Sequence, residues 1–158
     1  MPTTFEKSEK QTKLNVQFVK VHQNAKLPVY ATEGAAGMDL VNVLEEPLAL
    51  KPNERAKVPT GLVMILPDGY EGQVRPRSGL AAKYGITLTN CVGTIDSDYR
   101  GEICCLMINL GNEPYIIQPG ERIAQLVIAP VVQIETEFIP EIPKETKRGA
   151  GGFGSTGK

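Results

Sequence analysis

Two carboxylates, Asp96 and Asp98, lie in a short polar stretch between two apolar runs of the sequence. Tyr99 places an aromatic ring directly after them, and Gly93 and Gly101 flank the stretch. We expect a hairpin with a wide or bulged turn, in which the glycines adopt backbone angles that other residues disfavour. A loop that presents a carboxylate and a ring over a rigid sheet is a candidate small-molecule site. The alternative is that both aspartates are ordinary turn residues that bond their own backbone.

Ser78 stands where the only stretch with a helical pattern begins, and Gly85 stands where that stretch ends. The pattern predicts a helix of one or two turns that Ser78 caps and Gly85 stops. A helix N-terminus also binds anions, and Arg77 would add a positive charge there. Because capping and anion binding are compatible, the sequence predicts a phosphate-binding corner at this helix.

The stretch 148–158 is rich in glycine. It matches GxGxxG and most of a P-loop by accident, because no strand leads into it and no helix follows. Successive glycines still leave backbone amides able to bind an anion, and Arg148, Ser155 and Thr156 add donors. Phe153 is an apolar ring that could stack on a base when the segment closes. The alternative is a flexible terminus without a role.

The composition restricts the classes of function. With 17 Lys and Arg against 18 Asp and Glu, the net charge of −1 creates no global field for nucleic acid or an anionic membrane, so neither is expected as a partner. One histidine, His22, and three cysteines without a CxxC pair disfavour a zinc site and a histidine-dependent triad. The odd cysteine count indicates a reducing compartment, and we expect a cytoplasmic location. No apolar run is long enough for a membrane span. Phosphate-binding stretches without a metal cage favour a nucleoside polyphosphate that carries Mg²⁺.

Short strands must position these residues. Turn signals recur every eight to twelve residues or so and strands do not alternate with helices, which is typical of an all-β sandwich or jelly-roll barrel. Asp68 and Gly69 predict a hairpin turn. The Gly-rich stretch 30–40 is expected to be a tight connection in which Asp39 either caps a turn or serves the site. The predicted strands cover residues 15–21, 47–52, 55–66, 70–74, 103–109, 115–117, 122–129 and 131–138.

Changes in composition divide the chain into three parts. Residues 1–13 are charged and polar, and we expect a disordered N-terminal arm. Residues 14–140 hold the predicted strands and form the barrel domain. Residues 141–158 form a charged linker followed by the Gly-rich arm.

Five segments together resemble the motifs of the trimeric dUTP pyrophosphatase (dUTPase) family. They occur in the family's order along the whole globular length and cover residues 31–40, 77–80, 90–101, 119–125 and 148–157. The resemblance implies a distorted jelly-roll barrel with one short helix and a flexible Gly-rich C-terminal arm. It also implies a homotrimer with active sites at the subunit interfaces. The implied reaction is hydrolysis of dUTP to dUMP and pyrophosphate, which keeps uracil out of DNA and supplies dUMP for thymidylate synthesis.

The resemblance also implies roles for individual residues. Asp96 would be the general base that orients and deprotonates the attacking water, because in-line attack needs that water fixed. Asp39 and Asp98 would support the site, and Mg²⁺ would bind through the triphosphate rather than to protein side chains. The implied contacts are Asn90, Gly93, Thr94, Ile95 and Cys104 to uracil, Tyr99 to the deoxyribose, Arg77, Ser78, Gly79 and Gln125 to phosphates, and Arg148, Phe153, Gly154, Ser155 and Thr156 in the closing arm.

Two other functions are compatible with the same scaffold. A dCTP deaminase would need a proton-relay acid that faces the base, whereas the sequence offers Cys91 and Val92 there. A binding protein without turnover would have no need for a water-orienting base such as Asp96. Both alternatives are therefore weaker than the hydrolase.

Overall fold

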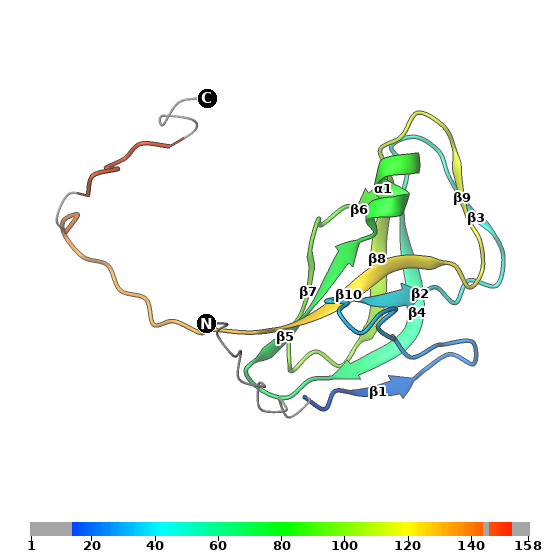
Figure 1. The fold of residues 1–158 in the computed structure, drawn as a ribbon, viewed down its shortest axis with the longest axis horizontal. Coiled ribbons are helices and arrows are strands. Elements are labelled where there is room, and N and C mark those ends of the chain that lie inside the picture. The colour runs from blue at the N-terminus through cyan, green and yellow to red at the C-terminus, as the bar shows by residue number, and fades with distance from the viewer. Residues whose placement is uncertain (1–13, 144–145, 153–158) are drawn as a thin grey trace, which may run out of the picture.

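The computed structural model describes residues 14–143 and 146–152, and Figure 1 shows their fold. The strands gather in one body with the single helix at one end of it, and the segment after the last strand runs away from this body. The elements are β1 (Gln17–Lys20), β2 (Met38–Val41), β3 (Leu48–Leu50), β4 (Arg55–Ile65), β5 (Tyr70–Pro76), α1 (Ser78–Tyr84), β6 (Ile86–Leu88), β7 (Gly93–Ile95), β8 (Glu102–Asn109), β9 (Tyr115–Ile117) and β10 (Arg122–Pro130).

The strands form two four-stranded sheets and one two-stranded sheet. Their orders are β1-β4-β8-β6, β2-β10-β5-β7 and β3-β9, and the pairings are antiparallel. One hydrophobic core takes side chains from both larger sheets, including Leu40 and Leu126 from one and Val58 and Met107 from the other. The expected all-β jelly-roll fold with one short helix is therefore confirmed.

Strand β8 shows how the alternating sequence pattern positions the site. Ile103, Cys105 and Met107 are buried in the core, whereas Glu102 and Cys104 on the opposite face remain partly exposed. Successive side chains of a strand point to opposite faces, so one face of β8 completes the core and the other is available to a ligand.

Two predicted hairpins are wrong. The turn at Asp68 and Gly69 exists, but β4 pairs with β1 and β8 while β5 pairs with β10 and β7, so the turn carries the chain between sheets. The stretch around Asp96 likewise joins β7 in one sheet to β8 in the other. Turn chemistry predicts a reversal of the chain, but it does not determine whether the two flanking strands pair with each other.

The glycines of the Asp96 stretch are needed for close packing rather than for unusual backbone angles. Among described residues around this stretch, positive φ occurs at Cys91 (φ +59°), not at Gly93 or Gly101. A Cβ on Gly93 would lie 3.3 Å from Val74 Cβ, and a Cβ on Gly101 would clash with the Tyr99 ring. Our expectation for these two glycines was wrong because their neighbours, not their φ angles, exclude a side chain.

Two strand assignments also differ from expectation. Asp39 lies within strand β2, where it pairs with Gln125 of β10, so it does not cap a turn. The predicted strand at 131–138 is absent, and Val132, Ile134 and Phe138 there are exposed. The alternating sequence favours a strand, but a strand also needs a neighbouring strand edge, and this segment runs away from the sheets (Figure 1).

The helix α1 begins one residue earlier than predicted. Its N-cap is Arg77, which makes no side-chain capping hydrogen bond, and Ser78 is the first helical residue. Gly85 ends the helix in the left-handed conformation (φ +71°), as expected, and its amide donates to the carbonyls of Ala81 and Leu80. Among the described residues, no helix combines the length and the apolar character needed to cross a membrane.

The buried thiol of Cys105 predicts a loss of stability at alkaline pH. Burial raises its pKa from 9.0 to about 12. The unfolded chain therefore releases this proton near pH 9 and the folded chain does not, so the free energy of unfolding falls as pH rises between these values. By about pH 10 the expected loss is about 1.4 kcal/mol.

Urea unfolding of the wild type and Cys105→Ala across this pH range measures the loss. Burial also raises the pKa of Tyr115, but that contribution is common to both proteins and cancels in the comparison. The wild type should lose more stability than the variant above about pH 9. Parallel curves for the two proteins would contradict the assignment.

Candidate functional site

A cavity of about 280 Å³ opens beside β7 and the start of β8. Its volume is near the lower end of the range for small-molecule sites. Six residues that the sequence predicted to contact a nucleoside share this cavity, although they come from separate parts of the sequence. The lining residues are Lys57, Val74, Asn90, Gly93, Thr94, Ile95, Tyr99, Glu102, Ile103, Cys104 and Leu106.

Strand β7 lies at the edge of its sheet. It pairs with β5 on one side, and within the described residues no strand pairs with its other side. An edge strand presents backbone N–H and C=O groups in a fixed row. A flat ligand that has both donors and acceptors along one edge can therefore be read by the main chain of Gly93, Thr94 and Ile95.

Asn90 and Gly93 shape one wall of the cavity. A Cβ on Gly93 would lie 3.1 Å from the Asn90 side-chain nitrogen, so the Asn90 amide lies against the backbone of β7. The absence of a side chain at Gly93 leaves this backbone accessible. An amide that both donates and accepts is thus placed beside a main-chain edge, which suits recognition of a planar base.

Cys104 contributes a neutral wall. Burial raises the pKa of its thiol, Glu102 raises it further, and Lys57 opposes this effect. A thiol with a raised pKa is a poor nucleophile. Cys104 therefore provides shape and main-chain groups to the cavity rather than reactive chemistry.

Tyr99 lies at the mouth of the cavity. Its hydroxyl donates to the main-chain carbonyl of Glu102 at 3.2 Å, and its ring packs over Gly101. The residue remains 46% exposed. Part of its surface is therefore available to pack against a ligand, while its hydroxyl already makes a hydrogen bond.

Asp96 follows the last residue of β7 but does not line this cavity. Its side chain is exposed and borders a neighbouring hollow of about 690 Å³ together with Asp98 and Glu71. The carbonyl of Asp96 also accepts the Tyr99 amide at 3.2 Å. The main chain of Asp96 thus takes part in the turn, while its carboxylate remains exposed beside the hollow.

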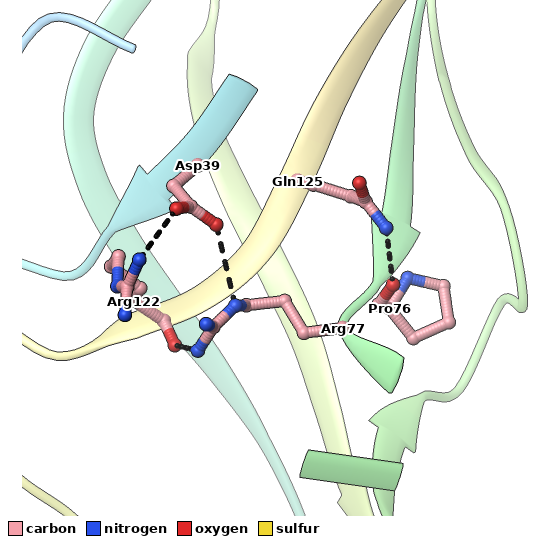
Figure 2. A network of polar contacts seen from close by, with 5 residues as sticks. All are labelled: Asp39, Pro76, Arg77, Arg122 and Gln125. Atoms are coloured by element: carbon pink, nitrogen blue, oxygen red, sulfur yellow. Dashed lines mark hydrogen bonds and ion pairs between the residues drawn. The ribbon is translucent and has the colours of Figure 1, made fainter. Parts of the chain in front are cut away.

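Two further predicted site residues, Arg77 and Gln125, lie near Asp39, as Figure 2 shows. The Asp39 carboxylate accepts a hydrogen bond from Arg122 Nη1 at 2.9 Å and pairs with Arg77 Nε at 3.3 Å. Arg77 also donates to the main-chain carbonyl of Arg122 at 2.8 Å. Two guanidinium groups thus share one carboxylate, which leaves a net positive charge on this surface.

Gln125 lies beside this cluster on β10. Its Nε2 donates to the Pro76 carbonyl at 2.9 Å (Figure 2). Its Oε1 would lie 2.5 Å from a Cβ on Gly37. Ser78 and Gly79 begin α1 nearby and are exposed, and a Cβ on Gly79 would meet nothing within 4 Å. Backbone and side-chain donors therefore border an open, positively charged surface that suits phosphate oxygens.

The arm is described only in part. Arg148 is exposed and donates to the Gly151 carbonyl at 2.9 Å, and Figure 1 shows this segment away from the barrel. The predicted contact residues Phe153, Gly154, Ser155 and Thr156 lie outside the described residues. The structure thus gives a local turn at Arg148 and no contact between that residue and either cluster.

The described residues offer no protein cage for a metal ion. Among residues 14–143 and 146–152, no group of three or more His, Cys, Asp or Glu side chains is suited to hold one. Mg²⁺ readily keeps water ligands and binds phosphate oxygens. A magnesium ion bound to phosphate oxygens and water would need no such group of side chains.

Sequence reasoning assigned no site role to three charged residues of these clusters: Lys57, Glu102 and Arg122. The alternation of β8 already placed Glu102 on the same face as Cys104, so this residue had a sequence signal. Lys57 reaches the cavity because β4 pairs with β8, with Lys57 opposite Leu106. That register is a property of the sheet and has no local signal in the sequence.

The two clusters do not share a cavity within one chain. None of Arg77, Ser78, Gly79 or Gln125 lines the cavity that holds Asn90 and Tyr99. One chain therefore presents a pocket of nucleoside size and, separately, a phosphate-binding surface.

Comparison with known proteins gives consistent matches. The dUTPase family model matches residues 23–157. The deoxyuridine 5'-triphosphate nucleotidohydrolase of Rhizobium johnstonii is 59% identical over 133 residues, which cover 83% of this chain and 85% of that protein. The one of Chlamydia pneumoniae is 55% identical over 140 residues, which cover 89% and 97%. The structure of Staphylococcus bacteriophage 80alpha dUTPase with dUPNHPP has a TM-score of 0.82 and 28% identity, and the match covers 91% of this chain and 99% of that chain.

Proposed function

This chain belongs to the dUTPase family and hydrolyses dUTP to dUMP, and from this premise we propose that its two clusters are the two halves of one active site. The cavity beside β7 binds deoxyuridine, and the Asp39 cluster of a neighbouring subunit binds the triphosphate. The observation that supports this division is that six predicted nucleoside contacts share one cavity, and that the described phosphate contacts Arg77, Ser78, Gly79 and Gln125 do not line it.

The base would be selected by the edge of β7. Uracil has two carbonyl acceptors and one ring N–H donor, which Asn90 and the main chain of Gly93 to Ile95 and Cys104 can satisfy. Cytosine would leave buried groups of the protein unpaired, and such a mismatch is worth on the order of 10⁴-fold in discrimination. Tyr99 would pack under the deoxyribose and leave no room for a 2′-hydroxyl.

Asp96 would fix and deprotonate the attacking water. The water attacks the α-phosphorus, the bond from that phosphorus to the bridging oxygen breaks, and pyrophosphate leaves with the electron pair. Asp96 directly follows Ile95 of the cavity wall, and this supports the proposal that its carboxylate would lie near the first phosphate of the bound nucleotide. Rigid placement of the water is the main requirement of this step.

Arg77, Ser78, Gly79 and Gln125 would hold the phosphate oxygens. Asp39 would act on them indirectly, because it fixes the orientation of the Arg77 guanidinium (Figure 2). Asp98 would support the turn that carries Asp96. Mg²⁺ bound to the triphosphate would neutralise part of the phosphate charge.

The proposal divides the chain into three parts. Residues 14–140 would form the barrel domain and residues 1–13 an N-terminal arm. Residues 141–158 would be a linker and lid, with Arg148, Gly154, Ser155 and Thr156 on the phosphates and Phe153 on uracil. The assembly would be a homotrimer, since each site needs residues from different subunits. In a reducing cytoplasm the reaction would keep uracil out of DNA and supply dUMP.

Mixing of two inactive variants tests whether the site is shared. Asp96→Asn and Arg77→Ala are each expected to be nearly inactive alone. When the two proteins are unfolded and refolded together, some sites combine the intact Asp96 of one chain with the intact Arg77 of another. Random mixing should restore roughly a quarter of the wild-type activity. If the mixture stays as inactive as its components, the two clusters do not come from different chains.

A further inference from the structure

Strand β4 is irregular where it passes the start of β8. Its register to β8 shifts between Pro59, which pairs with Cys104, and Val63, which pairs with Glu102. Gly61 lies in this bulge with φ +70°, a conformation that favours glycine. A bulge removes regular ladder hydrogen bonds, so its backbone groups need other partners.

The Glu102 side chain provides one such partner. Its Oε1 accepts the Gly61 amide at 2.7 Å. A second hydrogen bond joins the same two strands, with the side-chain donor on β4: the buried Thr60 hydroxyl donates to the Ile103 carbonyl at 2.7 Å. Two hydrogen bonds thus fix β8 residues 102 and 103 against the bulge.

The bulge itself has little freedom to move. The Gly61 carbonyl accepts the Val21 amide at 2.9 Å. A Cβ on Gly61 would lie 2.7 Å from His22 Cβ and 2.8 Å from Ala25 Cβ, so the segment after β1 packs directly on this backbone. The bulge is therefore a rigid support for whatever it binds.

The residues held by this support line the nucleoside cavity. Glu102, Ile103 and Cys104 are consecutive in its wall, and the Tyr99 hydroxyl donates to the Glu102 carbonyl at 3.2 Å. The side chain of Glu102 thus binds the bulge, and the main-chain carbonyl of Glu102 binds the Tyr99 hydroxyl. A displacement of Glu102 would therefore move Tyr99, which is proposed to contact the deoxyribose, together with the Cys104 main chain, which is proposed to contact the base.

We propose that Glu102 is a positioning residue for substrate selection, which sets the distance between Tyr99 and the Cys104 main chain by anchoring β8 to the β4 bulge. The proposal rests on the proposed function, in which this cavity binds deoxyuridine. Glu102 makes no contact with the reacting atoms. It acts through the geometry of the wall, where small displacements have large effects on binding.

Four variants test the proposal in assays of dUTP, UTP and dCTP turnover. Glu102→Ala removes the carboxylate, and Glu102→Gln keeps an oxygen that accepts the Gly61 amide. Glu102→Asp keeps the charge but shortens its reach, and it replaces Glu102→Ala if that variant does not fold. Glu54→Ala is the matched control, because Glu54 accepts the Lys51 amide at 2.8 Å in the turn before β4, outside the cavity wall.

Glu102→Ala should raise the KM for dUTP about tenfold, with a smaller change in kcat, and lower the preference for dUTP over UTP and dCTP by about tenfold. Glu102→Asp should show the same change to a smaller extent. Glu54→Ala should lower Tm by a similar amount to Glu102→Ala while KM and selectivity stay at the wild-type values. Glu102→Gln should retain the wild-type KM.

Two results would overturn the positioning role: wild-type KM and selectivity in Glu102→Ala and Glu102→Asp, or a Glu102→Gln variant as impaired as Glu102→Ala. The variant Asn90→Ala distinguishes a failure of the positioning role of Glu102 from a failure of the proposed function. It removes a side chain of the cavity directly, so an unchanged KM in Asn90→Ala would mean that the cavity does not bind the nucleoside at all.

Discussion

Replacement of Asp96 by asparagine is expected to lower kcat for dUTP hydrolysis by about 10³-fold while the affinity for the nucleotide stays close to that of the wild type. The amide keeps the size of the side chain and its place at the end of β7, but it does not accept a proton from the attacking water. Since Asp96 does not line the nucleoside cavity, its loss should not disturb base or sugar contacts. Steady-state kinetics gives kcat, and calorimetric titration with a non-hydrolysable dUTP analogue gives the affinity.

Asp98→Asn is the matched control for this variant. Both aspartates are exposed and border the same hollow, so the two substitutions remove the same charge from the same region. Asp98→Asn should therefore keep most of the activity if the position of the carboxylate matters rather than the local charge. Equal losses in the two variants would assign the effect to electrostatics and remove Asp96 as the specific base.

Removal of residues 148–158 is expected to lower kcat/KM by about 100-fold without a change in Tm. In the proposed mechanism this arm closes over the bound triphosphate and excludes water from it. The described part of the arm runs away from the barrel (Figure 1), and the side-chain hydrogen bond of Arg148 is to Gly151 within the arm. We therefore expect removal of the arm to leave the thermal stability of the barrel unchanged. Kinetics and thermal unfolding of the truncated protein measure the two effects.

Removal of Lys158 alone is the control for the truncation, because this residue lies outside the 148–157 segment of the motif. That shorter deletion should keep wild-type kinetics. Full activity in the protein that lacks residues 148–158 would exclude the arm from the mechanism, whereas a lower Tm would show that the arm also stabilises the barrel.

The proximity of several candidate site residues was predictable, whereas the roles proposed for them come from the resemblance to the family. Residues 90–95 and Tyr99 are close in sequence, so strand β7 and the turns beside it keep them near one another. Cys104 joins them because β8 begins directly after that loop and its alternation turns this side chain away from the core. The helix stop at Gly85 was predictable for a similar reason, since a left-handed position strongly favours glycine.

What could not be predicted depends on which strands pair. The turn at Asp68 and Gly69 has the composition of a hairpin, yet its flanking strands enter different sheets. The Asp39 cluster arises because β10 lies beside both β2 and β5, which brings Arg122 next to Arg77 across a long sequence separation. Long-range register is fixed by the packing of the whole core, and no short stretch of sequence carries it.

The failed strand at 131–138 has a different cause. Its alternating pattern is that of a strand, and Val132 and Phe138 are residue types that are enriched in strands. Hydrogen bonding in a sheet, however, requires a second strand, and the described part of a single chain supplies none to this segment. The sequence pattern indicates that a segment can form a strand, but the strand forms only where a neighbouring strand is available to pair with it.

The most direct test is product analysis after the purified protein is incubated with Mg²⁺ and, separately, dUTP, dCTP, dTTP and UTP. The cavity and the water-orienting Asp96 predict dUMP and pyrophosphate from dUTP, with little or no product from the other three nucleotides. Equal turnover of UTP would contradict the role of Tyr99 at the sugar. Formation of dUTP from dCTP, or no turnover of dUTP by the folded protein, would contradict the assigned hydrolysis itself.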